Sequence, residues 1–167
     1  LKAGMRRGVR RRWVRGWWTA LDKVYGESRM VSLEIKSADG ASSITLVERE
    51  PFETSAPIDY FTVQLTDAHL SASARVYANM LCNGLPELFA HIAQHWKDFT
   101  GPQAWSSLEG EFTLKVTHDG IGHFVIFAEL RSGNYERDWL VKSSVMVETS
   151  QLDRIASDVS KFIGCCS

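Results

Sequence analysis

The hydrophobic positions between Gly84 and Leu130 change from a helical period to a strand period. Residues 84–99 place apolar side chains three and four positions apart, which predicts a helix with one buried face. These positions are Leu85, Leu88, Phe89, Ile92, Trp96 and Phe99. Residues 111–130 alternate apolar and polar side chains on either side of a glycine-containing turn, which predicts a hairpin of half-buried strands. Helix and hairpin each have one face to bury, and each can bury it against the other.

The same alternation predicts strands on both sides of this central region. The predicted strands cover 31–37, 43–48, 59–66, 70–78 and 135–148. Small residues at 71–74 suggest that the helix approaches the fourth strand closely. Gly101 and Pro102 end the central helix, and residues 101–110 are predicted to form a turn that carries an anchoring tryptophan. Ser150 can cap a final helix, which Gly164 ends.

The predicted order of elements is therefore ββββαβββα. Segregated strands joined by hairpins, with one helix between the two groups and one after them, indicate an α+β fold with one antiparallel sheet of about seven strands and both helices on one face. The sequence shows no internal repeat. A chain of 167 residues with 44% hydrophobic and 23% charged residues is expected to form one globular domain.

The charge divides the chain into two parts. Residues 1–29 contain nine Lys/Arg and two Asp/Glu, a charge of +7, whereas residues 30–167 carry −8. Three interpretations of the basic extension remain open. It is a nucleic-acid or membrane-binding arm using its arginines and tryptophans, a targeting peptide, or a start-site artefact that precedes a natural start at Met30. The predicted domain is 30–163, followed by a tail at 164–167.

The cysteines favour a reducing compartment. Their number is odd, Cys82 stands in an apolar run, and Cys165 and Cys166 are adjacent near the end of the chain. This is not the pattern of a disulfide framework. No run of about 18 apolar residues, the length that a membrane span needs, is present. We therefore expect a cytoplasmic protein.

Two histidine pairs are the candidate metal ligands. His91 and His95 are four apart on the predicted helix, a spacing that puts two imidazoles on one side. Their sequence HIAQH lacks the glutamate that a zinc protease uses as general base. His118 and His123 flank the hairpin turn and are expected to face each other across it. For both pairs the competing interpretation is structural: a half-buried helix flank, and a solvated hairpin tip.

No motif for a nucleophile, a phosphate-binding loop or a dinucleotide is present, so no catalytic or cofactor-binding residue is predicted. Glu109, Glu111 and Glu129 are expected on a solvated face. Three tryptophans either line a ligand pocket or anchor the core and its rim; they are Trp96, Trp105 and Trp139.

The central region resembles a bacterial family of small proteins of unknown function. The resemblance rests on W-x-x-F-x-G, W-x-S-L-E-G-E-x-x-L, a Gly-His step before a hydrophobic strand, and a later strand ending in Val-Glu. In this chain the matching residues are Trp96, Phe99, Gly101, Trp105, Ser107, Leu108, Glu109, Gly110, Glu111, Leu114, Gly122, His123, Val147 and Glu148. The resemblance spans about 30–163, supports a start at Met30 and implies no enzymatic activity. The pattern is more distantly similar to immunity proteins that guard against contact-dependent, tRNA-cleaving toxins.

These observations lead to one functional hypothesis and two alternatives. The first is a non-enzymatic protein-binding domain, in its most specific form an immunity protein that neutralises a basic toxin nuclease through its acidic surface. The second is a metal-dependent enzyme that uses His91 and His95. The third is a nucleic-acid binder that acts through residues 1–29.

Overall fold

The computed structural model describes residues 32–51, 58–78, 84–133 and 138–164. The described elements are eight strands, two α-helices and two short 3₁₀ helices. In chain order they are β1 (Ser32–Lys36), β2 (Ser43–Glu50), β3 (Tyr60–Asp67), β4 (Leu70–Tyr77), α2 (Leu85–His95), η1 (Trp96–Asp98), β5 (Gln103–Ser106), β6 (Phe112–His118), β7 (His123–Arg131), β8 (Leu140–Glu148), η2 (Thr149–Gln151) and α3 (Leu152–Ile163). The predicted extension 1–29, Cys82, Cys165 and Cys166 lie outside the described residues.

The strands form two antiparallel sheets of four, in the orders β1-β2-β3-β4 and β5-β6-β7-β8. The α+β class with two helices is confirmed, but the single sheet of about seven strands is wrong. The strand that the prediction lacked is β5, where a turn was expected. This strand has four residues, of which only Trp105 is buried. A run of four residues is too short to show the alternation that predicts a strand. Each half of the chain thus has four strands and one helix, an order that the sequence does not reveal as a repeat.

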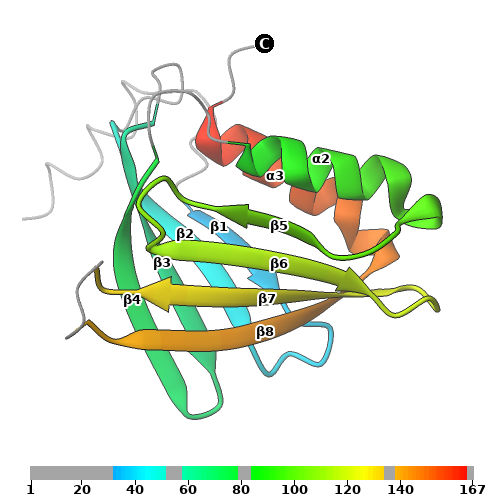
Figure 1. Cartoon of the computed structure of the whole chain (residues 1–167), viewed down its shortest axis with the longest axis horizontal. Coiled ribbons are helices and arrows are strands. Elements are labelled where there is room, and N and C mark those ends of the chain that lie inside the picture. Colours follow the sequence, from blue (N-terminus) through cyan, green and yellow to red (C-terminus); the bar gives the residue numbers. More distant parts are fainter. Residues whose placement is uncertain (1–31, 52–57, 79–83, 134–137, 165–167) are drawn as a thin grey trace, which may run out of the picture.

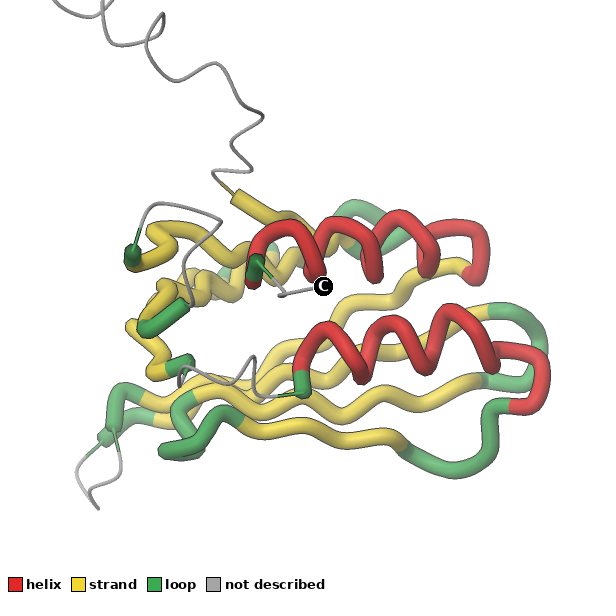
Figure 2. Tube along the Cα trace, turned by 90° about the horizontal axis from the view of Figure 1, so that it is seen from above, coloured by secondary structure: helices red, strands yellow, loops and turns green. Residues whose placement is uncertain are grey.

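The two sheets face each other, with their strands crossing at a steep angle (Figure 1). Their inner faces form one core whose largest fully buried side chains include Phe61, Phe112, Phe124 and Phe162. The helices pack against each other and lie side by side above the sheets (Figure 2). Helix α2 contacts β5, and helix α3 contacts β1. Each helix therefore lies against the first strand of the other half, which ties the two halves together.

The end of α2 and the start of α3 differ from the prediction. Helix α2 buries Leu85, Phe89 and Ile92, but it ends at His95. Trp96 and Phe99 follow in or after a 3₁₀ turn and are only half-buried, so they are not the centre of the stripe. The last helix is preceded by the 3₁₀ turn η2, which Glu148 and Gln151 start with a reciprocal capping box, so the expected Ser150 cap is not used.

The predicted end of the last helix is confirmed. Gly164 adopts φ = 73°, and its N–H donates to the carbonyl of Ser160 at 3.0 Å. A positive φ at this position is easy for glycine because it has no Cβ.

An irregularity in β2 brings a buried arginine to this helix end. The register with β3 shifts between Val47 and Glu50, and Glu48 has a positive φ of 53°. The side chain of Arg49, predicted to lie beyond the strand, is only 5% exposed. Its guanidinium donates to the carbonyl oxygens of Phe162 at 2.9 Å and Ile163 at 3.1 Å, and to that of Pro51. It therefore fastens the end of α3 to the first sheet.

The turn between β1 and β2 docks on the edge of β8. The Ala38 N–H donates to the Met146 carbonyl at 2.7 Å, and the Ser42 hydroxyl donates to the Ser144 carbonyl at 2.7 Å. The Met146 N–H in turn donates to the Ser37 hydroxyl at 3.2 Å. These bonds satisfy backbone groups that an edge strand would otherwise leave to water.

The small residues of β4 have a different neighbour from the one expected. The element that approaches this strand is β7 of the second sheet, not a helix. Ala72 and Ala74 lie on its inner side, half-buried against the core.

Within the described residues, no helix is long and apolar enough to cross a membrane.

Candidate interaction surface

His91 and His95 both lie on the exposed side of α2. Their rings stack with centroids 4.5 Å apart, and Nδ1 of His95 lies 3.0 Å from the carbonyl oxygen of His91. That nitrogen therefore donates to the helix backbone. The expectation of a half-buried flank is wrong for this pair, because both side chains are exposed.

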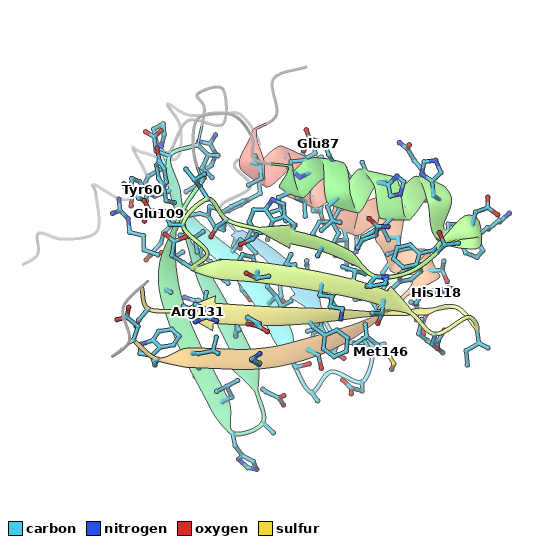
Figure 3. All side chains as sticks on the ribbon, in the orientation of Figure 1. Tyr60, Glu87, Glu109, His118, Arg131 and Met146 are labelled. Carbon is cyan, nitrogen blue, oxygen red and sulfur yellow. The ribbon has the colours of Figure 1, made fainter. Side chains whose placement is uncertain are left out.

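The second histidine pair does not face across the hairpin. In the register of β6 and β7, His118 lies opposite Phe124, while His123 lies opposite Glu148 of β8. The His118 ring stacks on Phe124 with centroids 4.4 Å apart, and its Nε2 is buried without a hydrogen-bond partner. Figure 3 shows His118 at the end of the second sheet that carries the β6–β7 turn.

His123 is instead held by the turn itself. Its Nδ1 lies 2.7 Å from Oδ2 of Asp119, whose Oδ1 accepts the backbone N–H groups of Ile121 at 2.8 Å and His123 at 3.0 Å. The pKa of the Asp119 carboxyl is held well below its usual range because the backbone N–H of His123 donates to it, with Ile121 adding to the effect. Asp119 therefore stays an anion at any ordinary pH.

The candidate ligands are not assembled into one site. Within the described part of the chain, no three His, Cys, Asp or Glu side chains lie close enough together to hold a metal ion. The two histidine pairs that the sequence offered lie on different elements, one on the surface of α2 and the other at the ends of β6 and β7 beside their turn.

The three glutamates have three different environments. Glu109 is exposed in the β5–β6 turn, as expected. Glu129 is half-buried on β7 and lies 2.6 Å from Nζ of Lys142. Glu111 is only 8% exposed, and the Ser107 hydroxyl donates to its Oε2 at 2.7 Å. The expectation of a solvated face is therefore wrong for Glu111, which the turn folds inward.

The residues of the motif that carried the family resemblance have structural roles. Ser107 also accepts the N–H of Phe112 at 3.1 Å, so it closes the β5–β6 turn. At the other end of the sheet, Thr149 donates its N–H and its hydroxyl to the Gly122 carbonyl, at 3.1 and 2.7 Å. Glu148 adds the capping box of η2, the 3₁₀ turn that leads into α3. These groups fix two turns and a helix start.

The tryptophans do not line one pocket. Trp105 is buried and packs edge-to-face on Phe112 with centroids 5.7 Å apart. Trp96 is half-buried beside the core, and Trp139, the residue that precedes β8, is 41% exposed. The anchor interpretation is therefore confirmed for Trp105 and Trp96.

The end of α2, the β6–β7 turn and the start of α3 lie at the same end of the domain (Figure 1), and each of these segments carries carboxylates. We define this acidic end by four residues of these segments, none of which has a Lys or Arg partner within the described residues: Asp98, Asp119, Glu148 and Asp153. The described residues hold nine Lys/Arg and sixteen Asp/Glu, a charge of −7. Several cations are already neutralised by ion pairs, so uncompensated negative charge remains on the surface.

The outer face of the second sheet has the opposite character. Phe127 is 44% exposed at its centre, opposite Ser144 on β8 and Lys115 on β6. Val125 and Met146 pair beside it and are half-buried. This face is apolar with basic neighbours, so it is suited to a different kind of contact from the acidic end.

The fold thus defines an α+β domain of two four-stranded antiparallel sheets and two helices. Residues 35–165 match DUF6228, a family of unknown function, and the chain belongs to this family. The predicted membership of a family of unknown function is confirmed. No curated protein and no solved structure matches the chain.

Proposed function

We propose that this domain is a non-enzymatic protein-binding module whose partner is a basic protein, and that in its most specific form it is an immunity protein for a toxin nuclease. The observation that carries the proposal is the acidic end, whose carboxylates lack Lys and Arg partners among the described residues. Carboxylates that lack Lys and Arg partners on one surface attract a basic partner and speed its association.

The acidic end is also a firm platform. Asp119 is fixed by two backbone N–H groups, Glu148 by the capping box, and both belong to turns that are bonded to each other through Thr149 and Gly122. Preorganised charges lose little conformational freedom when a partner binds, which favours affinity. The exposed histidine pair on α2 lies outside this platform and gives no support to a metal-dependent reaction.

The experiment uses the protein encoded by the gene directly upstream of the one that encodes this chain. Its C-terminal domain is purified and titrated with the full chain by calorimetry at about 50 and 500 mM salt. We expect binding that weakens at the higher salt concentration, because exposed charges are screened there. For the immunity form we also expect that co-expression of this chain restores growth to cells that produce the neighbouring domain.

Two charge-reversal variants separate local from overall charge. Asp98→Lys changes the acidic end, whereas Glu34→Lys makes the same change at an exposed position of β1. We expect the first to weaken binding by about tenfold or more and the second to change it little. Equal effects of the two variants, or binding lost in Phe127→Ala and kept in Asp98→Lys, would contradict the proposal.

A further inference from the structure

The four edge strands of the two sheets differ in what lies against their outer edges. The edge of β8 is bonded to the β1–β2 turn at Ser144 and Met146. The edge strands β1 and β5 lie against α3 and α2. The remaining edge strand, β4, pairs with β3 on one side and has no hydrogen-bonded neighbour among the described residues on the other. Figure 1 shows the β3–β4 hairpin extending past the second sheet.

The free backbone groups of β4 can be assigned from its pairing with β3. The hairpin has two loop residues, so Asp67 and Leu70 form its closing pair, and the Ala78 N–H donates to the Asp59 carbonyl at 2.8 Å. Even-numbered residues therefore bond to β3, and odd-numbered residues point their N–H and C=O groups away from the sheet. The outward-pointing residues are Ser71, Ser73, Arg75 and Tyr77.

The strand also lacks the devices that usually prevent pairing at an edge, namely proline, bulges and free charges. Its register with β3 is continuous from Leu70 to Tyr77. Its one charged side chain, Arg75, is folded back over the sheet. Nη2 lies 2.7 Å from Oε2 of Glu50, and the guanidinium carbon lies 3.7 Å from the centre of the Tyr60 ring. The charge is therefore compensated and directed away from the edge.

We propose that β4 pairs antiparallel with β4 of a second copy of this chain, about a two-fold axis at Ala74. This register places Ser73 opposite Arg75 of the second copy and Ser71 opposite Tyr77, so small side chains meet large ones. On the inner side, Ala74 meets its own counterpart. No like charges face each other in this arrangement, and the two first sheets become one continuous sheet of eight strands.

A second copy suits this edge because the strand is complementary to itself in its backbone hydrogen-bonding groups and in its charge. The outward backbone groups are equally spaced along both copies, as an isologous contact requires. Arg75, the one charged residue of β4, is paired with Glu50 in each copy, so the charge beside the two-fold axis is compensated. This dimer contact uses β4 and is independent of the acidic end.

The test measures the association of the full chain over a range of concentrations by sedimentation velocity. We expect a reversible monomer–dimer equilibrium. Ser73→Pro removes one outward N–H and no bond to β3, so it should weaken dimerisation at least about tenfold while the fold is kept. Ser73→Ala keeps the backbone N–H and should dimerise as the natural sequence does. Circular dichroism of each variant confirms that it is folded.

Amide hydrogen exchange identifies the surface. At concentrations that favour the dimer, the amides of Ser73 and Arg75 should be protected, and dilution should expose them. A full chain that stays monomeric throughout would overturn the proposal, as would a dimer that Ser73→Pro leaves intact. Protection of these amides at every concentration would also overturn it, because another segment of the same chain would then cover the edge.

Discussion

The guanidinium of Arg49 donates through Nε to the carbonyl oxygen of Phe162, at 2.9 Å, across 113 positions of sequence. The last carbonyls of a helix have no partner within the helix and carry its partial negative charge. A buried cation at this point satisfies two of them, at Phe162 and Ile163. The bulge of β2 and the end of α3 therefore depend on one side chain.

Replacing Arg49 by methionine should destabilise the domain by about 2–4 kcal/mol, because buried carbonyls lose charged donors while the apolar volume is largely kept. Urea denaturation measures the change. Arg75→Ala is the matched control, since its ion pair with Glu50 is more than half exposed and is worth less than about 1 kcal/mol. Equal losses in the two variants would show that Arg49 does not fasten α3.

Phe89→Ala should cost more stability than Trp96→Ala, although tryptophan is the larger side chain. Phe89 is 2% exposed in the core, whereas Trp96 lies half-buried beyond the end of α2. We expect a loss of about 3–5 kcal/mol for Phe89→Ala and roughly 1–2 kcal/mol for Trp96→Ala. Thermal and chemical denaturation of both variants test the order, and a reversed order would place Trp96 inside the core.

His118→Phe should leave stability unchanged or raise it by up to about 1 kcal/mol. The imidazole stacks on Phe124, and its buried Nε2 has no hydrogen-bond partner, so a phenyl ring keeps the contact and removes the uncompensated polar atom. His95→Phe on the exposed side of α2 serves as the comparison. A loss above about 1 kcal/mol in His118→Phe would mean that Nε2 makes a bond required for folding.

Asp119→Asn should lower the thermal midpoint at pH 7 and remove one acid-labile contribution to stability. The folded-state pKa of Asp119 is lowered, so the carboxylate stabilises the domain fully above the ordinary value of about 4. That contribution is lost as the pH falls from about 4 toward the lowered pKa. Midpoints measured from pH 7 to 2 should therefore converge for the two proteins. Curves that stay parallel would show that ionisation of Asp119 does not stabilise the turn.

Protein purified without chelator should contain far less than one zinc, nickel or copper ion per chain. The rings of His91 and His95 stack instead of converging, and Nδ1 of His95 is bonded to the helix backbone. Elemental analysis by mass spectrometry measures the metal content. Stoichiometric metal that disappears in His95→Ala would support the metal-dependent alternative instead.

Much of the local structure was determined by the sequence alone. Alternation predicted seven of the eight described strands, and the helical period predicted both helices, because each element buries one face and its side chains repeat with that face. The end of α3 at Gly164 could also be predicted from local sequence, because the left-handed conformation of the residue after a helix favours glycine.

The strand β5 and the division into two sheets were decided by tertiary structure. Four residues contain too few alternations to be distinguished from a turn, and strand partners are chosen by packing over long sequence distances. The burial of Arg49 and Glu111 could not be predicted from the sequence either. Both are charged residues whose desolvation is offset by partners that only the folded chain supplies, carbonyls more than 100 residues away for Arg49 and a turn hydroxyl for Glu111.

The candidate site divides in the same way. The sequence determined which residues carry charge and that residues 30–167 have an excess of carboxylates. Only the tertiary structure decided that the end of α2, the β6–β7 turn and the start of α3 share one end of the domain, and that His118 packs on Phe124. It also decided that β4 has one edge without a strand partner among the described residues. Hydrophobic period is a local property of the chain, whereas surface charge and open edges depend on which segments the core brings together.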